Sequence, residues 1–235
     1  MSRQQALQAL KSLSPGRAGR LPIVGGRACL DFINTSSGRG SDHHKENLKS
    51  YFDLLAWAHH AGILTAGDTL ELVARARARP AAAHRAFSRA LALREALHAI
   101  FAATIQRAPV PAPAVAAFNG FMAKTARAER FEPASGGFGW GWSAAQPTGL
   151  DRTLWPIVRT AVELLADGPL DRLKACGGGS ACGWIFLDQT RNGRRRWCEM
   201  EVCGSRAKMR RYRGRLAKSR AGSRSSLVML RKNKI

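Results

Sequence analysis

Four of the five cysteines fall in two close pairs, and this spacing constrains the fold more than any other feature of the chain. Five residues, GGGSA, separate Cys176 from Cys182, and four residues, EMEV, separate Cys198 from Cys203. Zinc takes four tetrahedral ligands, and thiolate sulfurs at about 2.3 Å suit it. The glycines after Cys176 let the backbone turn tightly enough to point both sulfurs inward. The spacing therefore predicts a structural zinc site, because four thiolates leave no open position for a catalytic water.

Two other uses of these cysteines stay open at the level of sequence. Two disulfides fit the same count, but no N-terminal stretch is apolar enough for a signal peptide, so we expect a cytosolic protein with reduced thiols. A redox switch is the third reading, although neither pair has the C-x-x-C spacing. Cys29 stands apart from the pairs, and we expect it to be a buried apolar residue.

The charge is concentrated near the C-terminus. The net charge is +22, and residues 171–235 hold 18 Lys and Arg against 4 Asp and Glu, a net +14, while the first 170 residues hold 20 against 12, a net +8. A GC-rich genome favours Arg but does not explain this clustering, which indicates a polyanionic partner, with nucleic acid ahead of membrane. No run approaches the roughly 18 apolar residues of a membrane span. We expect a cytoplasmic, nucleoid-associated protein.

The basic residues lie around the second cysteine pair. We expect a β-hairpin turning at Asn192-Gly193 and a helix after Cys203, with Met209 and Tyr212 packing on the finger. Like charges at helical spacing repel each other, so a polyanion would compensate them. The candidate nucleic-acid-binding residues are Arg191, Arg194, Arg195, Arg196, Arg206, Lys208, Arg210, Arg211, Arg213 and Arg215.

Apolar residues at helical spacing dominate the part of the chain before the cysteines. Thr65 and Asp68 have capping-box spacing, the aromatics around Gly136-Gly137 predict a hairpin, and Pro156 predicts a kink. The fold class is mainly α: an N-terminal helical domain with a short β-hairpin, and a C-terminal treble-clef-like zinc finger of β-hairpin and helix. The predicted segments are a flexible arm 1–24, a helical domain 25–168, a zinc finger 169–218 and a basic disordered tail 219–235.

Other features carry weaker hypotheses. A ligand pocket near Trp57, Trp140, Trp142 and Trp155 is one, although aromatics at helical spacing more often form core. We expect the paired histidines at 43–44 and 59–60 to be loop and helix-end residues rather than a second metal site. The chain offers no nucleophile with a matching base, so we do not expect an enzyme.

Several stretches resemble one bacterial family from Gly25 to about Arg215. CGWIFLDQTRNGRRRWCEMEVCGSRAK resembles the CGNR zinc finger, and ACLDFINT, YFDLLAWAHHAGIL, ALREALHAIF and LDRTLWPIVRTAVELL resemble, in the right order, the ABATE domain that accompanies it. The resemblance implies a stress-related transcription regulator that binds one zinc through the four paired cysteines. The first knuckle is one residue longer than usual. Ser205 stands where the family has Asn; Ser can still cap a helix start, but whatever contact Asn makes is in question.

The leading hypothesis is a zinc-dependent, DNA-binding transcription regulator. Its helical domain would sense a signal, such as a small-molecule ligand, or mediate self-association with a homodimer partner. The alternative is a zinc protein that binds RNA or the ribosome without sequence preference.

Overall fold

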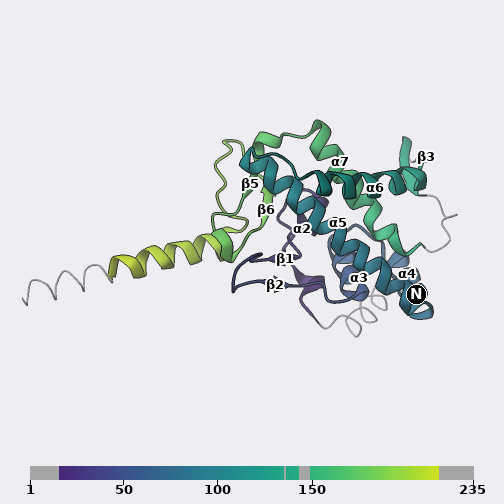
Figure 1. Ribbon diagram of the computed structural model, residues 1–235, viewed down its shortest axis with the longest axis horizontal. Helices are drawn as coiled ribbons and strands as arrows, with labels where there is room; N and C mark the ends of the chain where they lie inside the picture. The colour runs from purple at the N-terminus through teal and green to yellow at the C-terminus, as the bar shows by residue number, and fades with distance from the viewer. Residues whose placement is uncertain (1–15, 135, 143–148, 217–235) are drawn as a thin grey trace, which may run out of the picture.

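The computed structural model describes residues 16–134, 136–142 and 149–216, and its body is a bundle of helices around one core (Figure 1). The α-helices are α2 (Ala28–Ile33), α3 (Tyr51–His60), α4 (Ala66–Ala78), α5 (Pro80–Gln106), α6 (Ala112–Ala128) and α7 (Trp155–Asp167), and residues 205–216 are also helical. The strands form three antiparallel pairs, β1 (Ser36–Ser37) with β2 (Lys45–Glu46), β3 (Glu129–Ala134) with β4 (Gly137–Trp142), and β5 (Leu173–Ala175) with β6 (Ile185–Leu187). Short helical turns are η1 (Ala18–Arg20), η2 (Leu150–Leu154), η3 (Leu170–Arg172), η4 (Gly179–Ala181) and the π-turn η5 (Met200–Gly204).

Local sequence signals set the ends of several helices. The Ser50 side chain accepts a hydrogen bond from the N–H of Asp53 at the start of α3, and Thr65 and Asp68 form the predicted capping box at the start of α4. Both arrangements satisfy backbone donors that a first helical turn leaves free. The helix α2 buries Cys29 fully, as expected from the sequence.

The predicted kink at Pro156 is wrong. Pro156 is the second residue of α7, which begins at Trp155 directly after the tight turn η2. The N–H that proline lacks would have no partner within the first turn of a helix, so proline costs nothing there. Apolar residues continue at helical spacing on both sides of Pro156, so the sequence alone does not mark a helix start there.

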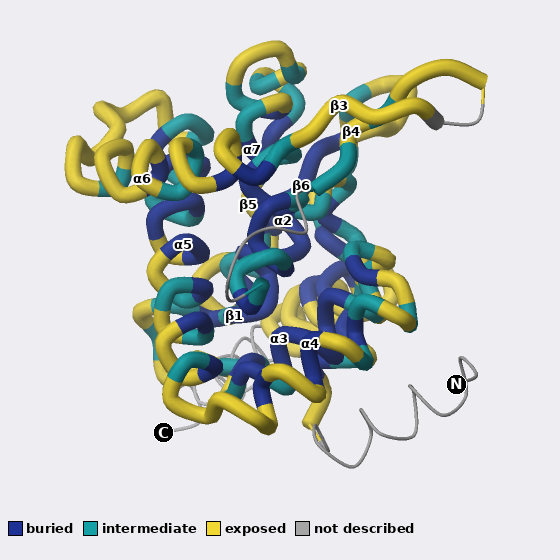
Figure 2. Tube along the Cα trace, turned by 90° about the vertical axis from the view of Figure 1, so that its right-hand side faces the viewer, coloured by how far each residue is buried: buried dark blue, intermediate teal, exposed yellow. Residues whose placement is uncertain are grey.

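One apolar core joins the helices to the last β-hairpin (Figure 2). Trp57 and Phe32 are fully buried with their ring centroids 5.3 Å apart, and α5 contributes Leu93, Leu97 and Phe101. The same core includes three residues of β5 and β6, namely Leu173, Ile185 and Leu187. The predicted tail at 219–235 and residues 1–15 of the predicted arm lie outside the described residues, but Ala18 and Leu21 within that arm are buried in the core.

The strands β3 and β4 form an arm that projects from the body, as Figure 2 shows. This is the hairpin that the sequence predicted around Gly136-Gly137. Its register pairs Phe131 with Trp140. Phe131, Phe138 and Trp140 are 63%, 68% and 56% exposed.

Candidate metal centre and nucleic-acid interface

The four paired cysteines meet at one point. All four Sγ atoms lie within 4.8 Å of one another, and the Sγ of Cys198 is 3.7 Å from that of Cys182 and 3.6 Å from that of Cys203. A tetrahedron with bonds of about 2.3 Å places its sulfurs about 3.8 Å apart, whereas a disulfide needs about 2.05 Å. The thiols are therefore unbonded to each other, and the set fits one structural zinc ion. Among the described residues this is the one cluster of potential metal ligands, so the paired histidines join none.

The first knuckle lies in the turn between β5 and β6. Cys176 follows β5, and Cys182 follows the tight turn η4. A Cβ on Gly178 would lie 2.9 Å from the Cβ of Cys182 and 3.5 Å from the sulfurs of Cys176 and Cys203, so only glycine fits there without displacing the ligands. The N–H groups of Gly178 and Cys198 each donate to the Cys176 sulfur at 3.4 Å. Such bonds orient a metal ligand and stabilise its thiolate form.

The second knuckle is the start of the C-terminal helix. The carbonyl of Glu199 accepts hydrogen bonds from the N–H groups of Cys203 at 3.0 Å and Gly204 at 3.2 Å, which closes the π-turn η5. Ser205 already has helical dihedrals, and its hydroxyl donates back to the Met200 carbonyl at 3.5 Å. Glu199 occupies the N-cap position, so Ser205 does not cap the helix start.

The close packing of the sulfurs shifts their acidity. Hydrogen bonds from the thiols of Cys182 and Cys198 lower the pKa of Cys176 to about 2. The same hydrogen bonding with Cys176 and Cys182, together with burial, raises the pKa of Cys198. The lowered pKa of Cys176 favours its thiolate, which is the form that binds a metal.

The predicted hairpin at Asn192-Gly193 is wrong in its pairing. Asn192 and Gly193 do turn the chain, and the Gly193 N–H donates to the Thr190 carbonyl at 3.1 Å. However, β6 pairs with β5 and not with residues 194–197. The N–H of Arg195 donates instead to the Asp188 carboxylate at 2.9 Å, and the Lys174 ammonium binds the same carboxylate at 2.7 Å and the Arg195 carbonyl at 3.3 Å. These bonds use the backbone groups that a second strand would need.

Asp188 is the buried centre of this loop. Its side chain is fully buried beside Lys174, and its second carboxylate oxygen accepts from the N–H and the hydroxyl of Thr190 at 3.0 and 2.5 Å. Although burial raises the pKa of Asp188, the Lys174 ammonium and the Thr190 donors hold it well below its usual range. A charged Asp188 thus fixes the loop that carries Arg194, Arg195 and Arg196 toward the second cysteine pair.

Arg195 is turned into the protein. Its guanidinium donates to the carbonyls of Trp197 at 3.0 Å, Val24 at 2.9 Å and Cys198 at 2.5 Å, and lies 4.2 Å from the centre of the Phe186 ring. All three acceptors are backbone carbonyls, and two of them belong to the segment around Cys198. Arg195 therefore stabilises the loop beside the cysteine site, and its Nε and one terminal nitrogen are already used in bonds within the protein.

The other predicted basic residues are exposed. None of them forms an ion pair with a residue that the structure describes: Arg191, Arg194, Arg196, Arg206, Lys208, Arg210, Arg211, Arg213 and Arg215. Six of the nine lie on the helix of residues 205–216, which extends away from the body (Figure 1). Because of that extension, Met209 and Tyr212 are 47% and 55% exposed, and the prediction that they pack on the finger is wrong.

Asn34 joins the finger to the helical part, and sequence reasoning missed it. Its side-chain amide donates to the Ile185 carbonyl at 2.8 Å and its side-chain oxygen accepts from the Ile185 N–H at 2.9 Å. The Leu187 N–H continues this pattern by donating to the Gly25 carbonyl at 2.8 Å. Asn34 is buried directly after α2. The signal in the sequence was a polar amide residue at the end of an apolar run.

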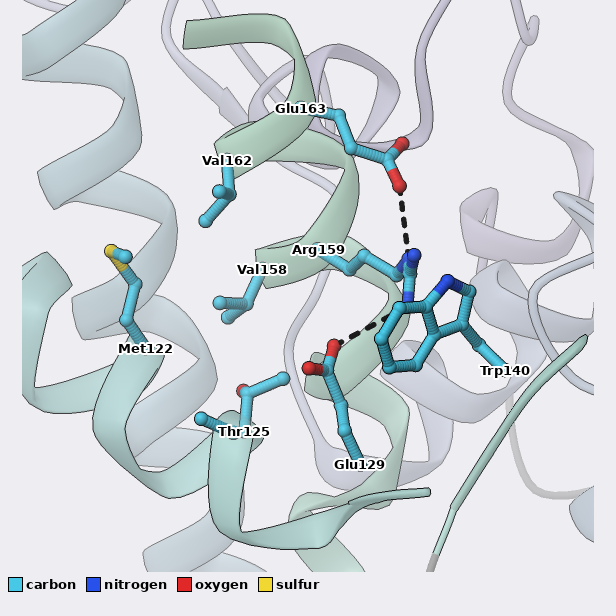
Figure 3. A pocket seen from close by; sticks show the side chains of 9 residues that line it. Met122, Thr125, Glu129, Trp140, Val158, Arg159, Val162 and Glu163 are labelled. Carbon is cyan, nitrogen blue, oxygen red and sulfur yellow. Dashed lines mark hydrogen bonds and ion pairs between the residues drawn. The ribbon is translucent and has the colours of Figure 1, made fainter. Parts of the chain in front are cut away.

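A separate pocket of about 220 Å³ lies between α6 and α7 (Figure 3). The Arg159 guanidinium lies 4.2 Å from the centre of the Trp140 ring and pairs with Glu129 at 3.5 Å and Glu163 at 2.9 Å. Met122, Val158 and Val162 form its apolar wall. Of the tryptophans expected at a ligand pocket, Trp140 alone lines this one; Trp57 and Trp155 are buried, and Trp142 packs on Trp155 at 5.6 Å.

The fold and the cysteine cluster define a mainly helical protein with a C-terminal zinc finger. Residues 26–168 match the family model ABATE, described as "Putative stress-induced transcription regulator", and residues 172–216 match the CGNR zinc finger. The chain belongs to the ABATE family, in the order of domains that the sequence resemblance implied. A comparison with curated proteins gave no match. Both descriptions are regulatory or metal-binding and neither names an enzyme, and no described helix has the length and apolar character to cross a bilayer.

Proposed function

We propose that this chain is a zinc-dependent, DNA-binding transcription regulator of the bacterial nucleoid. The observation that carries the proposal is the helix of residues 205–216, which has six cations, no acid and no ion pair with a described residue. The cysteine cluster fixes the start of this helix, so bound zinc would hold the cations in one orientation. In this proposal residues 25–168 are the regulatory domain, 169–218 the finger, and 1–24 and 219–235 the flanking arm and tail.

The expected strength of binding depends on salt. A protein that neutralises roughly 5–8 phosphates loses affinity with a log–log salt slope of about −5 to −7. Phosphate contacts position a protein without reading bases, so the charge alone supports DNA binding and leaves the target sequence open.

The test compares two triple variants with the same charge. Lys208→Ala, Arg211→Ala and Arg213→Ala together should weaken binding to duplex DNA at low salt by more than tenfold, since about three phosphate contacts are lost. The control, Arg85→Ala, Lys124→Ala and Arg127→Ala, removes three exposed cations elsewhere and should bind nearly as wild type. Equal losses in both would show that affinity follows net charge and not this helix.

Selection of bound sequences from random duplex DNA separates the regulator from the alternative. An enriched sequence supports a DNA-binding regulator. No enriched sequence, together with equal competition by RNA, supports the RNA- or ribosome-binding protein instead.

For the helical domain we propose a regulatory role, as a sensor or as a site of self-association. The pocket at Trp140 supports the first role, and the exposed aromatic tip of the β3–β4 arm supports the second, because large exposed apolar patches mark interaction sites. Light scattering tests self-association directly, since a dimer has twice the mass of one chain.

A further inference from the structure

A second concave surface lies where the finger meets the helical domain. It has a volume of about 470 Å³ and its walls include the zinc-site residues Cys182, Cys198 and Cys203. Basic side chains from both sides of this cleft line it: Arg17, His43 and Lys45 from the N-terminal part of the chain, and Arg206 and Arg210 from the finger helix. Of these five residues, only Arg206 and Arg210 are predicted from the sequence to bind nucleic acid.

The cations of this cleft are unpaired. Arg17, Lys45, Arg206 and Arg210 are exposed, and none forms an ion pair or side-chain hydrogen bond with a described residue. Glu199 is the one acidic residue among the lining side chains. A zinc ion with four thiolates carries a formal charge of about −2. Even with that charge and Glu199 included, the permanent cations are in excess, and they lie toward solvent while the cysteines are buried.

The N-terminal wall of the cleft is held rigidly against the finger. The Gly38 N–H donates to the Cys182 carbonyl at 2.8 Å. The Ser41 hydroxyl donates to the Gly38 carbonyl at 2.8 Å and also lies 3.2 Å from the Ser180 carbonyl of the finger. Strand β2 is tied to α5 because Glu46, next to Lys45, pairs with the buried guanidinium of Arg94 at 2.5 Å. The backbone that carries His43 and Lys45 is therefore held opposite the finger helix.

We propose that this cleft binds a backbone phosphate of duplex DNA, so that Arg17 of the N-terminal arm joins His43 and Lys45 of the helical domain in the interface. These three residues would lie across from Arg206 and Arg210. The inference deepens the proposed function and rests on it. A phosphate is a multivalent acceptor that several converging cations can share, and a groove of one charge sign concentrates its counter-ion. A contact of this kind would set the orientation of the duplex along the molecule and carry no sequence information.

The experiment is a salt titration of duplex-DNA affinity with a matched pair of double variants. Arg17→Ala with Lys45→Ala should reduce the magnitude of the log–log slope by about 1, because each phosphate contact contributes about 0.9. Lys124→Ala with Arg127→Ala removes the same charge from α6, at the opposite side of the molecule from the finger in Figure 1, and should keep the wild-type slope. All four side chains are exposed, so both variants should fold.

The outcomes separate this inference from the function on which it rests. A wild-type protein that binds no duplex DNA at low salt overturns the proposed function itself. If wild type binds, the finger-helix triple variant does not, and the Arg17 and Lys45 variant keeps the wild-type slope, the cleft is not a phosphate site although the regulator stands. Faster zinc loss to a chelator with an unchanged slope overturns the inference as well, since it would mean that the cations only neutralise the thiolates.

Discussion

At the scale of single residues, Gly178 is the position that the cysteine site tolerates least. An alanine Cβ there would be 2.9 Å from the Cβ of Cys182, closer than side-chain atoms normally approach. Overpacking of this kind costs about 1–3 kcal/mol, so Gly178→Ala should weaken zinc binding about fivefold or more in competition with a chromophoric chelator. Gly120→Ala is the control, because Gly120 lies within α6 with open space around it and should gain about 0.5–1 kcal/mol of stability. Unchanged zinc affinity in Gly178→Ala would contradict this account of the knuckle.

The residues that sequence could identify are those whose role is set by their near neighbours. Cys176 and Cys182 are linked through a glycine turn, so spacing alone predicts that they share a site. Arg195 reads as one more cation in a basic run, and its burial depends on the Val24 carbonyl, 171 residues away in the sequence. Asn34 likewise acts on Ile185, 151 residues away. No local pattern contains these contacts.

At the scale of elements, too, the sequence predicts short-range arrangements and misses long-range ones. The capping box at Thr65 and the hairpin around Gly136-Gly137 are confirmed, because each is a short-range arrangement. The sequence predicted that β6 pairs with the residues that follow the Asn192-Gly193 turn. In the structure β6 pairs instead with β5, which precedes it in the chain. The reason is burial: pairing with β5 places Ile185 and Leu187 in the main core and Phe186 on the cysteine side.

The β3–β4 arm gives a prediction at this scale. Phe131 and Phe138 stack with their ring centroids 5.1 Å apart near the tip of the arm, and they are more than 60% exposed. A second copy of the arm would bury this surface. Phe131→Ser with Phe138→Ser should therefore convert a dimer to a monomer in light scattering, whereas Val110→Ser, at an exposed apolar residue in the α5–α6 connection, should not. A wild-type monomer at all concentrations would leave the pocket at Trp140 as the regulatory feature of the domain.

At the scale of the whole molecule, the finger and the helical domain share one core. Alternate residues of β6 serve the two parts, so that Ile185 and Leu187 pack with the helices while Phe186 packs with the cysteines. Residues 24–41 lie along the finger and form hydrogen bonds with the backbone of Ile185, Leu187 and Cys182. The helical domain is thus positioned to influence how the finger and the cleft meet DNA.

This shared core predicts that the finger does not fold alone. A chain cut between residues 168 and 169 would expose Leu173, Ile185 and Leu187, which together account for several kcal/mol of burial. The isolated fragment of residues 169–235 should bind zinc but show no cooperative thermal unfolding, whereas the two fragments expressed together should co-purify. Asn34→Ala should weaken that association by about 1–3 kcal/mol, since it leaves the buried backbone of Ile185 without partners. Asn119→Ala, at an exposed position of α6, is the control. A fragment that unfolds cooperatively by itself would show that the zinc site, and not the shared core, stabilises the finger.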